Sequence, residues 1–459
     1  IAKPYTRSAY NFFDRITMET LSSWLWNPFL AFIYLEIGVL FLVVTRFAAW
    51  RGALDEMRAL WRDRTIDTKH ADEDVSHRHA FFAALAASVG VGNLAGVGTA
   101  IHLGGPGALF WMWVSALLGM SFRMSSVFWA IKMARRDKDS ELFATPMFYM
   151  VNMLGAKWKW LASALALILM IKGMVTANLI QANSVAHAIS GEIGVSNLLV
   201  AALLCAAVAL VVVGGYKSIL RFSSVAAPWM IVAYLLCGWA ILLFTPANTM
   251  EALLSVFYYA FNPYSIAGGV AGYAVLETLQ FGIARGIFSH GSGIGIAPFW
   301  QGANRGDPAK SALLAAAVPL TDTLIICTTT GLVVLTADQW LNLTGAYLTV
   351  TSFSHFLGNA GRMVVTVCLV IFAFTTIINW AHFSERCFQF LGGKDIRHFR
   401  WFFAAVTFVG PFLPLRPLWS LGDLLIGLML IVHLIPLTYI VVRHSRVMCL
   451  GLLTKEEVD

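Results

Sequence analysis

The sequence contains few charged residues. Only 12% of its 459 residues are Asp, Glu, Lys or Arg, whereas 58% are hydrophobic, and the mean hydropathy is +0.72. A soluble domain carries about 25% charged residues, so the composition excludes a soluble globular protein. It predicts an all-α polytopic membrane protein embedded in the lipid bilayer. The formal charge of +7 indicates basic cytoplasmic loops and not nucleic-acid binding.

Cysteine is also scarce. Its 6 positions lie in or beside apolar segments, and none belong to a C-x-x-C pair. This spacing argues against a disulfide framework or a zinc site. We expect these side chains to be small apolar fillers, and we expect no organic cofactor.

Apolar runs long enough to cross a bilayer, which takes roughly 20 residues, recur along the whole chain. We expect about eleven spans. They lie at residues 27–46, 80–103, 107–133, 158–189, 196–214, 223–244, 267–302, 309–336, 350–390, 399–414 and 419–442. The intervals 267–302 and 350–390 exceed one straight span. The first should therefore contain a broken helix, and the second a long helix with an exposed end.

Basic residues alternate from loop to loop. Lys and Arg gather in the loops near 47–79, 132–138, 217–221, 305–310 and 394–400 and after 443, but four intervening loops have none and 415–418 has only Arg416. The positive-inside rule then predicts an outer N-terminus and a cytoplasmic C-terminus, in the plasma membrane of a bacterium (its inner membrane).

The ends of the chain are predicted to lie outside the bundle of spans. Residues 1–26 predict an amphipathic segment on the membrane surface. Residues 27–79 predict an extra membrane helix followed by a basic cytoplasmic loop, and residues 443–459 a cytoplasmic tail.

Two spans carry glycine clusters near mid-span, where glycine weakens a helix by about 1 kcal/mol relative to alanine. They read GVGNLAGVG at 90–98 and SHGSGIG at 289–295. If the span at 27–46 is set aside, the two glycine-rich spans are the first and the sixth of the ten remaining spans. Residues 80–244 and 267–442 then form two inverted five-helix repeats, joined by an extracellular connection at 245–266. Interrupted helices at matching positions indicate a transporter's binding site; close helix packing by small residues is the alternative.

A broken helix exposes backbone N–H and C=O groups at mid-depth, where only a cavity or a bound species makes them tolerable. Carbonyls can coordinate sodium, and N–H groups at the start of a half-helix can hold a carboxylate. A zwitterionic substrate moving with a cation would satisfy both. We expect an inward-opening cavity between the two breaks.

Several longer stretches resemble one family. GGPGALFWMWVSALLG at 104–119, QANSVA at 181–186, TDTLIICTTTGLV at 321–333 and FAFTTIINWAHFSERC at 372–387 are similar to motifs of the alanine or glycine:cation symporters, also called sodium:alanine symporters. The resemblance implies a leucine-transporter-like fold of five plus five inverted helices behind one extra helix. It also implies sodium as the coupled ion and small neutral amino acids as substrates, and it makes the chain a transporter and not an enzyme.

The chain departs from the family pattern at both breaks. It has Ser-His-Gly-Ser-Gly at 289–293 where the family usually has Ser-Asn-Glu-Ala-Gly, and Val91 where the family has Thr. Because of these changes, the sequence does not decide which amino acid is the substrate, or whether sodium or a proton is the coupled ion.

The resemblance implies a sodium site. Its ligands would be the hydroxyls of Thr375 and Thr376 and the carbonyls of Ala86, Val89 and Phe372. The alternative for the two threonines is a hydroxyl bonded to its own helix.

Substrate-binding residues are expected at the two breaks and on the facing spans. They are Ser88, Gly90, Gly92, Asn93, Gln181, Ser289, Gly293 and Trp380. Asn93 can instead cap the second half-helix, and Trp380 can instead be a core or interfacial residue.

Two ionisable residues are candidates for coupling or gating. Asp322 is the lone carboxylate of its span, and intramembrane acids are functional by default; a structural strut to Arg285 or Arg362 is the alternative. His290 lies at the second break and can respond to pH, or it can cap freed backbone groups.

Three other functions compete with sodium symport. They are proton-coupled amino-acid transport, a transporter-like sensor or assembly subunit, and a membrane-embedded acyltransferase. The last would need a reactive pair such as His355 with Asp338, for which the sequence has no motif. Oligomeric partners are not readable from the sequence.

Overall fold

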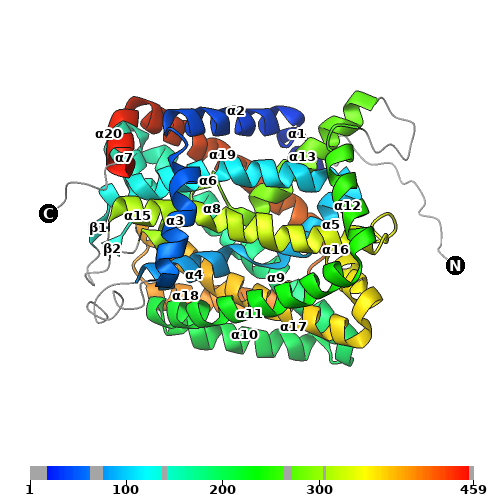
Figure 1. Cartoon of the computed structure of the whole chain (residues 1–459). Helices are drawn as coiled ribbons and strands as arrows, with labels where there is room; N and C mark the ends of the chain where they lie inside the picture. The colour runs from blue at the N-terminus through cyan, green and yellow to red at the C-terminus, as the bar shows by residue number, and fades with distance from the viewer. Residues whose placement is uncertain (1–17, 63–75, 137–141, 263–270, 303–306, 454–459) are drawn as a thin grey trace, which may run out of the picture.

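The computed structural model describes residues 18–62, 76–136, 142–262, 271–302 and 307–453, and these are almost entirely helical (Figure 1). The described chain begins with α1 (Met18–Leu25), α2 (Pro28–Val44) and α3 (Ala48–Arg62). The first half continues with α4 (His77–Ser88), η3 (Val91–Asn93), α5 (Ala95–Gly104), α6 (Ala108–Lys132), α7 (Pro146–Leu154), η4 (Ala156–Trp158), α8 (Lys159–Met174), η5 (Val175–Leu179), α9 (Ile180–Ile193), α10 (Asn197–Val213) and α11 (Tyr216–Phe244).

The second half follows a connecting helix. The elements are α12 (Pro246–Tyr259), α13 (Ala271–His290), α14 (Pro298–Gln301), α15 (Pro308–Pro319), η6 (Leu320–Cys327), α16 (Thr328–Thr336), α17 (Gly345–Phe390), α18 (Ile396–Val409), η7 (Gly410–Phe412), α19 (Leu415–Arg443) and α20 (Ser445–Leu453). Two-residue strands β1 (Arg135–Arg136) and β2 (Leu142–Phe143) form one antiparallel pair.

The polytopic class is confirmed, but the count of eleven spans is not. Within the described ranges, 6 helices are long and apolar enough to cross a membrane, or up to 8 if each of two bent pairs is one span. One such pair is α4 with the η3–α5 segment, bent by 62°. The predicted span 399–414 shows why the counts differ: its helix α18 has only 14 residues and ends before Pro411.

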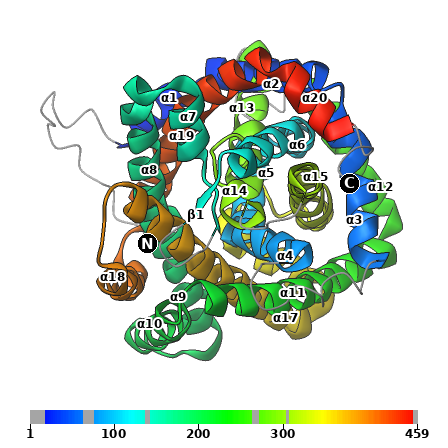
Figure 2. The ribbon, with the colours of Figure 1, turned by 90° about the vertical axis from the view of Figure 1, so that its left-hand side faces the viewer.

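Both glycine clusters interrupt a helix, as predicted. α4 ends at Ser88, and the chain is extended at Gly90 before the short turn η3. α13 ends at His290, and α14 begins only at Pro298. Viewed from the end of the bundle, α4, α5, α6, α13, α14 and α15 occupy the centre, and α2, α3, α11, α17, α10, α18, α8 and α19 lie around them (Figure 2).

Two helices lie across the ends of the bundle, where loops were expected. α3 opens the predicted basic loop 47–79, turns by 75° from α2, and packs on α6 and α15. α12 fills much of the predicted connection 245–266 and contacts α16 (Figure 1). α17 is the predicted long helix, but Gly358 interrupts it with φ 57° and ψ −142°.

Candidate functional site

The first break is held open by two amide side chains. The Gly90 N–H donates to Asn93 Oδ1 at 2.9 Å, and the Val91 N–H donates to Gln181 Oε1 at 3.1 Å. These bonds satisfy N–H groups that a continuous helix would have paired internally. A Cβ at Gly90 would lie 2.5 Å from Thr376 Oγ1, so the absence of a side chain lets α17 approach the break.

The second break depends on glycine in a different way. Gly291, Gly293 and Gly295 have φ values of 62°, 87° and 88°, a region that costs other residues strain. His290 is fully buried: its Nδ1 accepts from the Ser292 N–H at 3.0 Å, and its Nε2 lies 3.2 Å from Ser115 Oγ. Both ring nitrogens thus have protein partners, as a group that caps the break would have.

A polar junction, consisting of Asn93, Ser289, Asp322 and Thr323, connects both breaks to η6. Asn93 Nδ2 donates to Asp322 Oδ1 at 2.7 Å, and the hydroxyls of Ser289 and Thr323 donate to Asp322 Oδ2 at 2.6 and 3.0 Å. The Asn93 amide also donates to Ser289 Oγ at 3.0 Å. One buried carboxylate therefore gathers donors from three segments.

The alternative role for Asp322, a strut to Arg285 or Arg362, is wrong. Arg285 makes a bidentate ion pair with Asp423, with distances of 2.8 and 2.6 Å, and Arg362 pairs with Glu192 at 2.9 Å. Asp322 instead lies fully buried in the junction.

The predicted sodium ligands converge in part. Thr376 Oγ1 lies 3.2 Å from the Val89 carbonyl across the first break and 2.9 Å from the Phe372 carbonyl of its own helix. Thr375 Oγ1 lies 3.0 Å from the same Phe372 carbonyl, but its other oxygen contact, Ile371 O, belongs to α17 as well. Ala86, one turn before Val89, is buried in α4. Carbonyl and hydroxyl oxygens from two segments thus meet, the chemistry that suits sodium.

A narrow central cavity of about 20 Å³ lies between the two breaks, α8 and α17. Six of the predicted substrate residues line it: Ser88, Gly90, Gly92, Gln181, Ser289 and Trp380. Asn93 belongs to the polar junction beside it. Gly293 lies elsewhere, where its carbonyl is 2.6 Å from His433 Nδ1.

The sequence did not lead us to predict two further residues of the cavity wall, Lys172 and Phe288. Lys172 Nζ lies 3.8 Å from the ring centroid of Trp380 and 5.7 Å from that of Phe288. The sequence does contain a feature that could have indicated Lys172: it is the one lysine in the interior of the apolar run 160–189. Ionisable residues inside a membrane span are functional by default.

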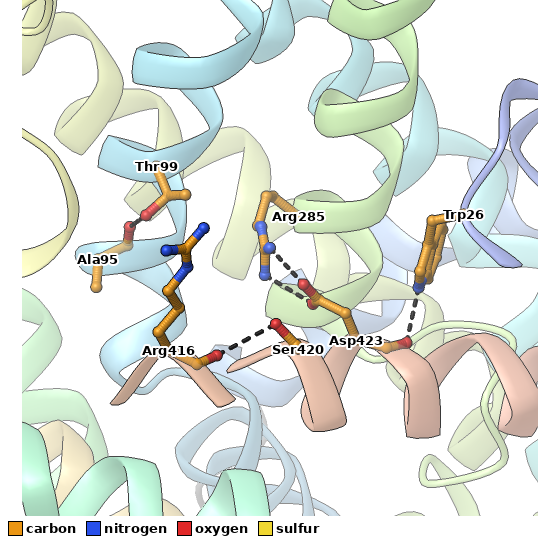
Figure 3. A network of polar contacts seen from close by, with 7 residues as sticks. All are labelled: Trp26, Ala95, Thr99, Arg285, Arg416, Ser420 and Asp423. Atoms are coloured by element: carbon orange, nitrogen blue, oxygen red, sulfur yellow. Dashed lines mark hydrogen bonds and ion pairs between the residues drawn. The ribbon is translucent and has the colours of Figure 1, made fainter. Parts of the chain in front are cut away.

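A larger cavity of about 950 Å³, which we call the vestibule, lies between α5, α9, α13, α17 and α19. Trp419 of its wall packs on Phe288 of the central cavity, with ring centroids 4.9 Å apart. The Arg285–Asp423 ion pair joins α13 to α19 (Figure 3), and Arg285 Cζ lies 5.3 Å from the ring centroid of Trp419. In the orientation that the basic loops predict, the vestibule opens outward. The inward-opening cavity stays a prediction, because the side of the membrane that the vestibule faces depends on this orientation.

Comparison with known proteins places the chain in a family. The model of the sodium:alanine symporter family matches residues 11–449. The sodium/alanine symporter AgcS of Methanococcus maripaludis is 35% identical over 434 residues, covering 92% of this chain and 93% of AgcS. The probable sodium/glutamine symporter GlnT of Bacillus subtilis is 30% identical, covering 90% and 85%. The chain belongs to the sodium:alanine symporter family.

Membership in the sodium:alanine symporters has two consequences. The chain is an amino-acid:cation symporter of the membrane and not an enzyme, because the family and its relatives are transporters. Its fold is also that of solved transporters. The crystal structure of MhsT in complex with L-phenylalanine superposes with a TM-score of 0.58 at 12% identity, covering 83% of this chain and 100% of MhsT. The leucine-transporter-like fold is thereby confirmed.

Proposed function

We propose that this sodium:alanine symporter family member couples the inward movement of sodium to uptake of small neutral amino acids, of the alanine or glycine type. The observation that carries the proposal is the meeting of both broken helices at one narrow cavity, with the oxygens of Thr376, Val89 and Phe372 beside it. We further propose a bacterial plasma-membrane location, with the N-terminus outside.

The two breaks offer groups for each end of a zwitterion. The first break places the backbone of Gly90 and Gly92 in the cavity wall, and N–H groups at the start of a half-helix favour the substrate carboxylate. The C-terminus of α13 presents carbonyls, which favour the ammonium group. The small volume and the glycines of the cavity wall favour a small side chain.

Transport would proceed by alternating access around this fixed site. The vestibule supplies the outer route, and separation of Trp419 from Phe288 would connect it to the central cavity. Proton coupling through His290 has less support, because both of its ring nitrogens bond to Ser292 and Ser115 and it is fully buried.

Uptake into proteoliposomes tests the proposal directly. We expect alanine and glycine to accumulate with an inward sodium gradient and not with potassium. Replacing both Thr375 and Thr376 with Val keeps the shape and removes the hydroxyls, so half-maximal uptake should require about tenfold more sodium or more, at unchanged protein abundance. Equal uptake in sodium and potassium would refute sodium coupling. An unchanged sodium response in the double variant would place the ion site elsewhere.

A further inference from the structure

A single histidine interrupts the apolar run of α19. Residues 424–437 read LLIGLMLIVHLIPL, and His433 is the one ionisable residue among them. Its side chain is buried, at 1% exposure, so its ring nitrogens need partners within the protein. Ionisable residues inside a membrane span are functional by default, and neither the sodium site nor the substrate route proposed above uses this histidine.

Both ring nitrogens of His433 have buried partners. Nδ1 lies 2.6 Å from the Gly293 carbonyl oxygen, which can only accept, so Nδ1 carries the proton and donates. Nε2 of the neutral ring is then an acceptor, and the Tyr149 hydroxyl donates to it at 2.5 Å. The Tyr149 oxygen accepts in turn from the Ser126 hydroxyl at 3.1 Å. We call Ser126, Tyr149 and His433 the histidine clamp, and the carbonyl at its end fixes the direction of every bond in it.

The histidine clamp joins three helices to the second break. Ser126 lies on α6, Tyr149 on α7 and His433 on α19. The backbone that they hold is not helical, with φ values of 87° at Gly293 and 88° at Gly295. Packing is also close on this side, because a Cβ at Gly295 would lie 3.2 Å from His433 Cδ2. The clamp therefore fixes a stretch of backbone that has left the helical hydrogen-bond pattern.

The clamped backbone also forms part of the central cavity. Gly291, Ile294 and Ile296 line that cavity, and Gly293, whose carbonyl the clamp holds, lies between them in the chain. A displacement of the Gly293 carbonyl therefore moves the cavity wall on both sides of it. A binding site must be held to within about 0.5 Å of its productive geometry, so a narrow cavity for a small substrate depends on how firmly this stretch is held.

We propose that His433 and Tyr149 are positioning residues of the substrate site. Through the Gly293 carbonyl they hold Gly291, Ile294 and Ile296 in the arrangement that binds the amino acid, without contacting it themselves. The inference rests on the proposed transport function. It gives α7 and α19, which lie outside the two broken helices, a share in the affinity for substrate.

Tyr149→Phe tests the clamp with the smallest change, because it keeps the ring and removes only the hydroxyl that donates to His433. We expect the KM of sodium-driven alanine uptake in proteoliposomes to rise about fivefold or more, with the maximal rate within about twofold of the wild-type value. Tyr234→Phe is the matched control: Tyr234 is equally buried, and its hydroxyl bonds to Thr330 Oγ1 at 2.7 Å, between α11 and α16. Its KM should stay at the wild-type value. An unchanged KM in Tyr149→Phe, with or without a lower maximal rate, overturns the inference.

Two substitutions of His433 separate the bond to Gly293 from general packing. His433→Leu removes the donor, and we expect the KM for alanine to rise about tenfold or more. His433→Asn offers an amide N–H near the position of Nδ1, and it should restore KM to within about threefold of the wild-type value. Equal KM values in the two variants overturn the role of this bond, and if neither variant accumulates, Tyr149→Phe decides the test. Unchanged KM values refute only this inference, whereas failure of the wild-type protein to transport any amino acid refutes the proposed function.

Discussion

Gly90 lies where the first break packs against α17. A Cβ there would stand 2.5 Å from Thr376 Oγ1, so Gly90→Ala must displace the hydroxyl from the Val89 carbonyl. We expect sodium-driven uptake to fall by about tenfold or more at equal abundance, because binding geometry tolerates little displacement. Gly96→Ala is the control, since a Cβ at Gly96 meets no atom within 4 Å. Equal rates in the two variants would contradict the proposed contact.

The sequence predicted residues that belong to recognisable local patterns and missed those that depend on distant packing. Gly90, Gln181, Ser289 and Trp380 were predicted from the breaks and the family motifs, and all line the central cavity. The contact of Lys172 with Trp380 joins residues of α8 and α17. A span that is apolar on all sides does not reveal which face meets the core, so no local pattern gives this pairing.

The polar junction is the point at which elements from both halves are joined. In Asp322→Asn, one acceptor oxygen becomes an NH₂ group that faces existing donors, such as the Ser289 hydroxyl. We expect a loss of about 2 kcal/mol in the free energy of unfolding, together with loss of transport. Unfolding of the purified protein in mixed micelles measures it.

Asp338→Asn provides the comparison, because Asp338 is exposed just beyond α16. Surface substitutions usually change stability by less than about 0.5 kcal/mol. If Asp322→Asn were no less stable than Asp338→Asn, the junction would not hold the elements together.

At the level of elements, the sequence predicted the breaks better than the helices at the ends of the bundle. Both glycine clusters interrupt helices where glycine removes helical preference. α3 was missed because its charged residues resemble a loop, although Ala49, Ala53 and Leu60 form a buried face. The π-helical segments η5 and η6 were not predicted either, because the amino-acid composition of a helix does not reveal a π-helical turn. Such bulges often lie at functional sites.

Across the whole molecule, the described ends of the chain lie apart. α1 lies toward one end of the bundle and α20 toward the other (Figure 1). α3 and α20, which flank or follow predicted basic segments, lie toward one end of the bundle, whereas α12 lies toward the opposite end (Figure 1). This distribution supports the proposed orientation, with the vestibule facing outward. The Trp26 indole donates to the Asp423 carbonyl at 2.7 Å (Figure 3). This bond connects the turn between α1 and α2 to α19, the helix that also carries the carboxylate of the Arg285–Asp423 ion pair.

Solvent access to the vestibule tests this arrangement. Thr99 lines the vestibule on α5, and Thr99→Cys should react with a membrane-impermeant maleimide added outside intact cells; the parent protein gives the background from its own cysteines. Sodium with alanine should slow the reaction, because closure over the substrate removes access to the vestibule.

Adding Asp423→Asn leaves Arg285 without its bidentate partner, which should loosen the contact between Trp419 and Phe288. We therefore expect faster labelling and weaker protection by substrate in the double variant. Labelling of Thr99→Cys from the cytoplasmic side alone, in inside-out vesicles, would reverse the orientation and return the vestibule to an inward-opening cavity.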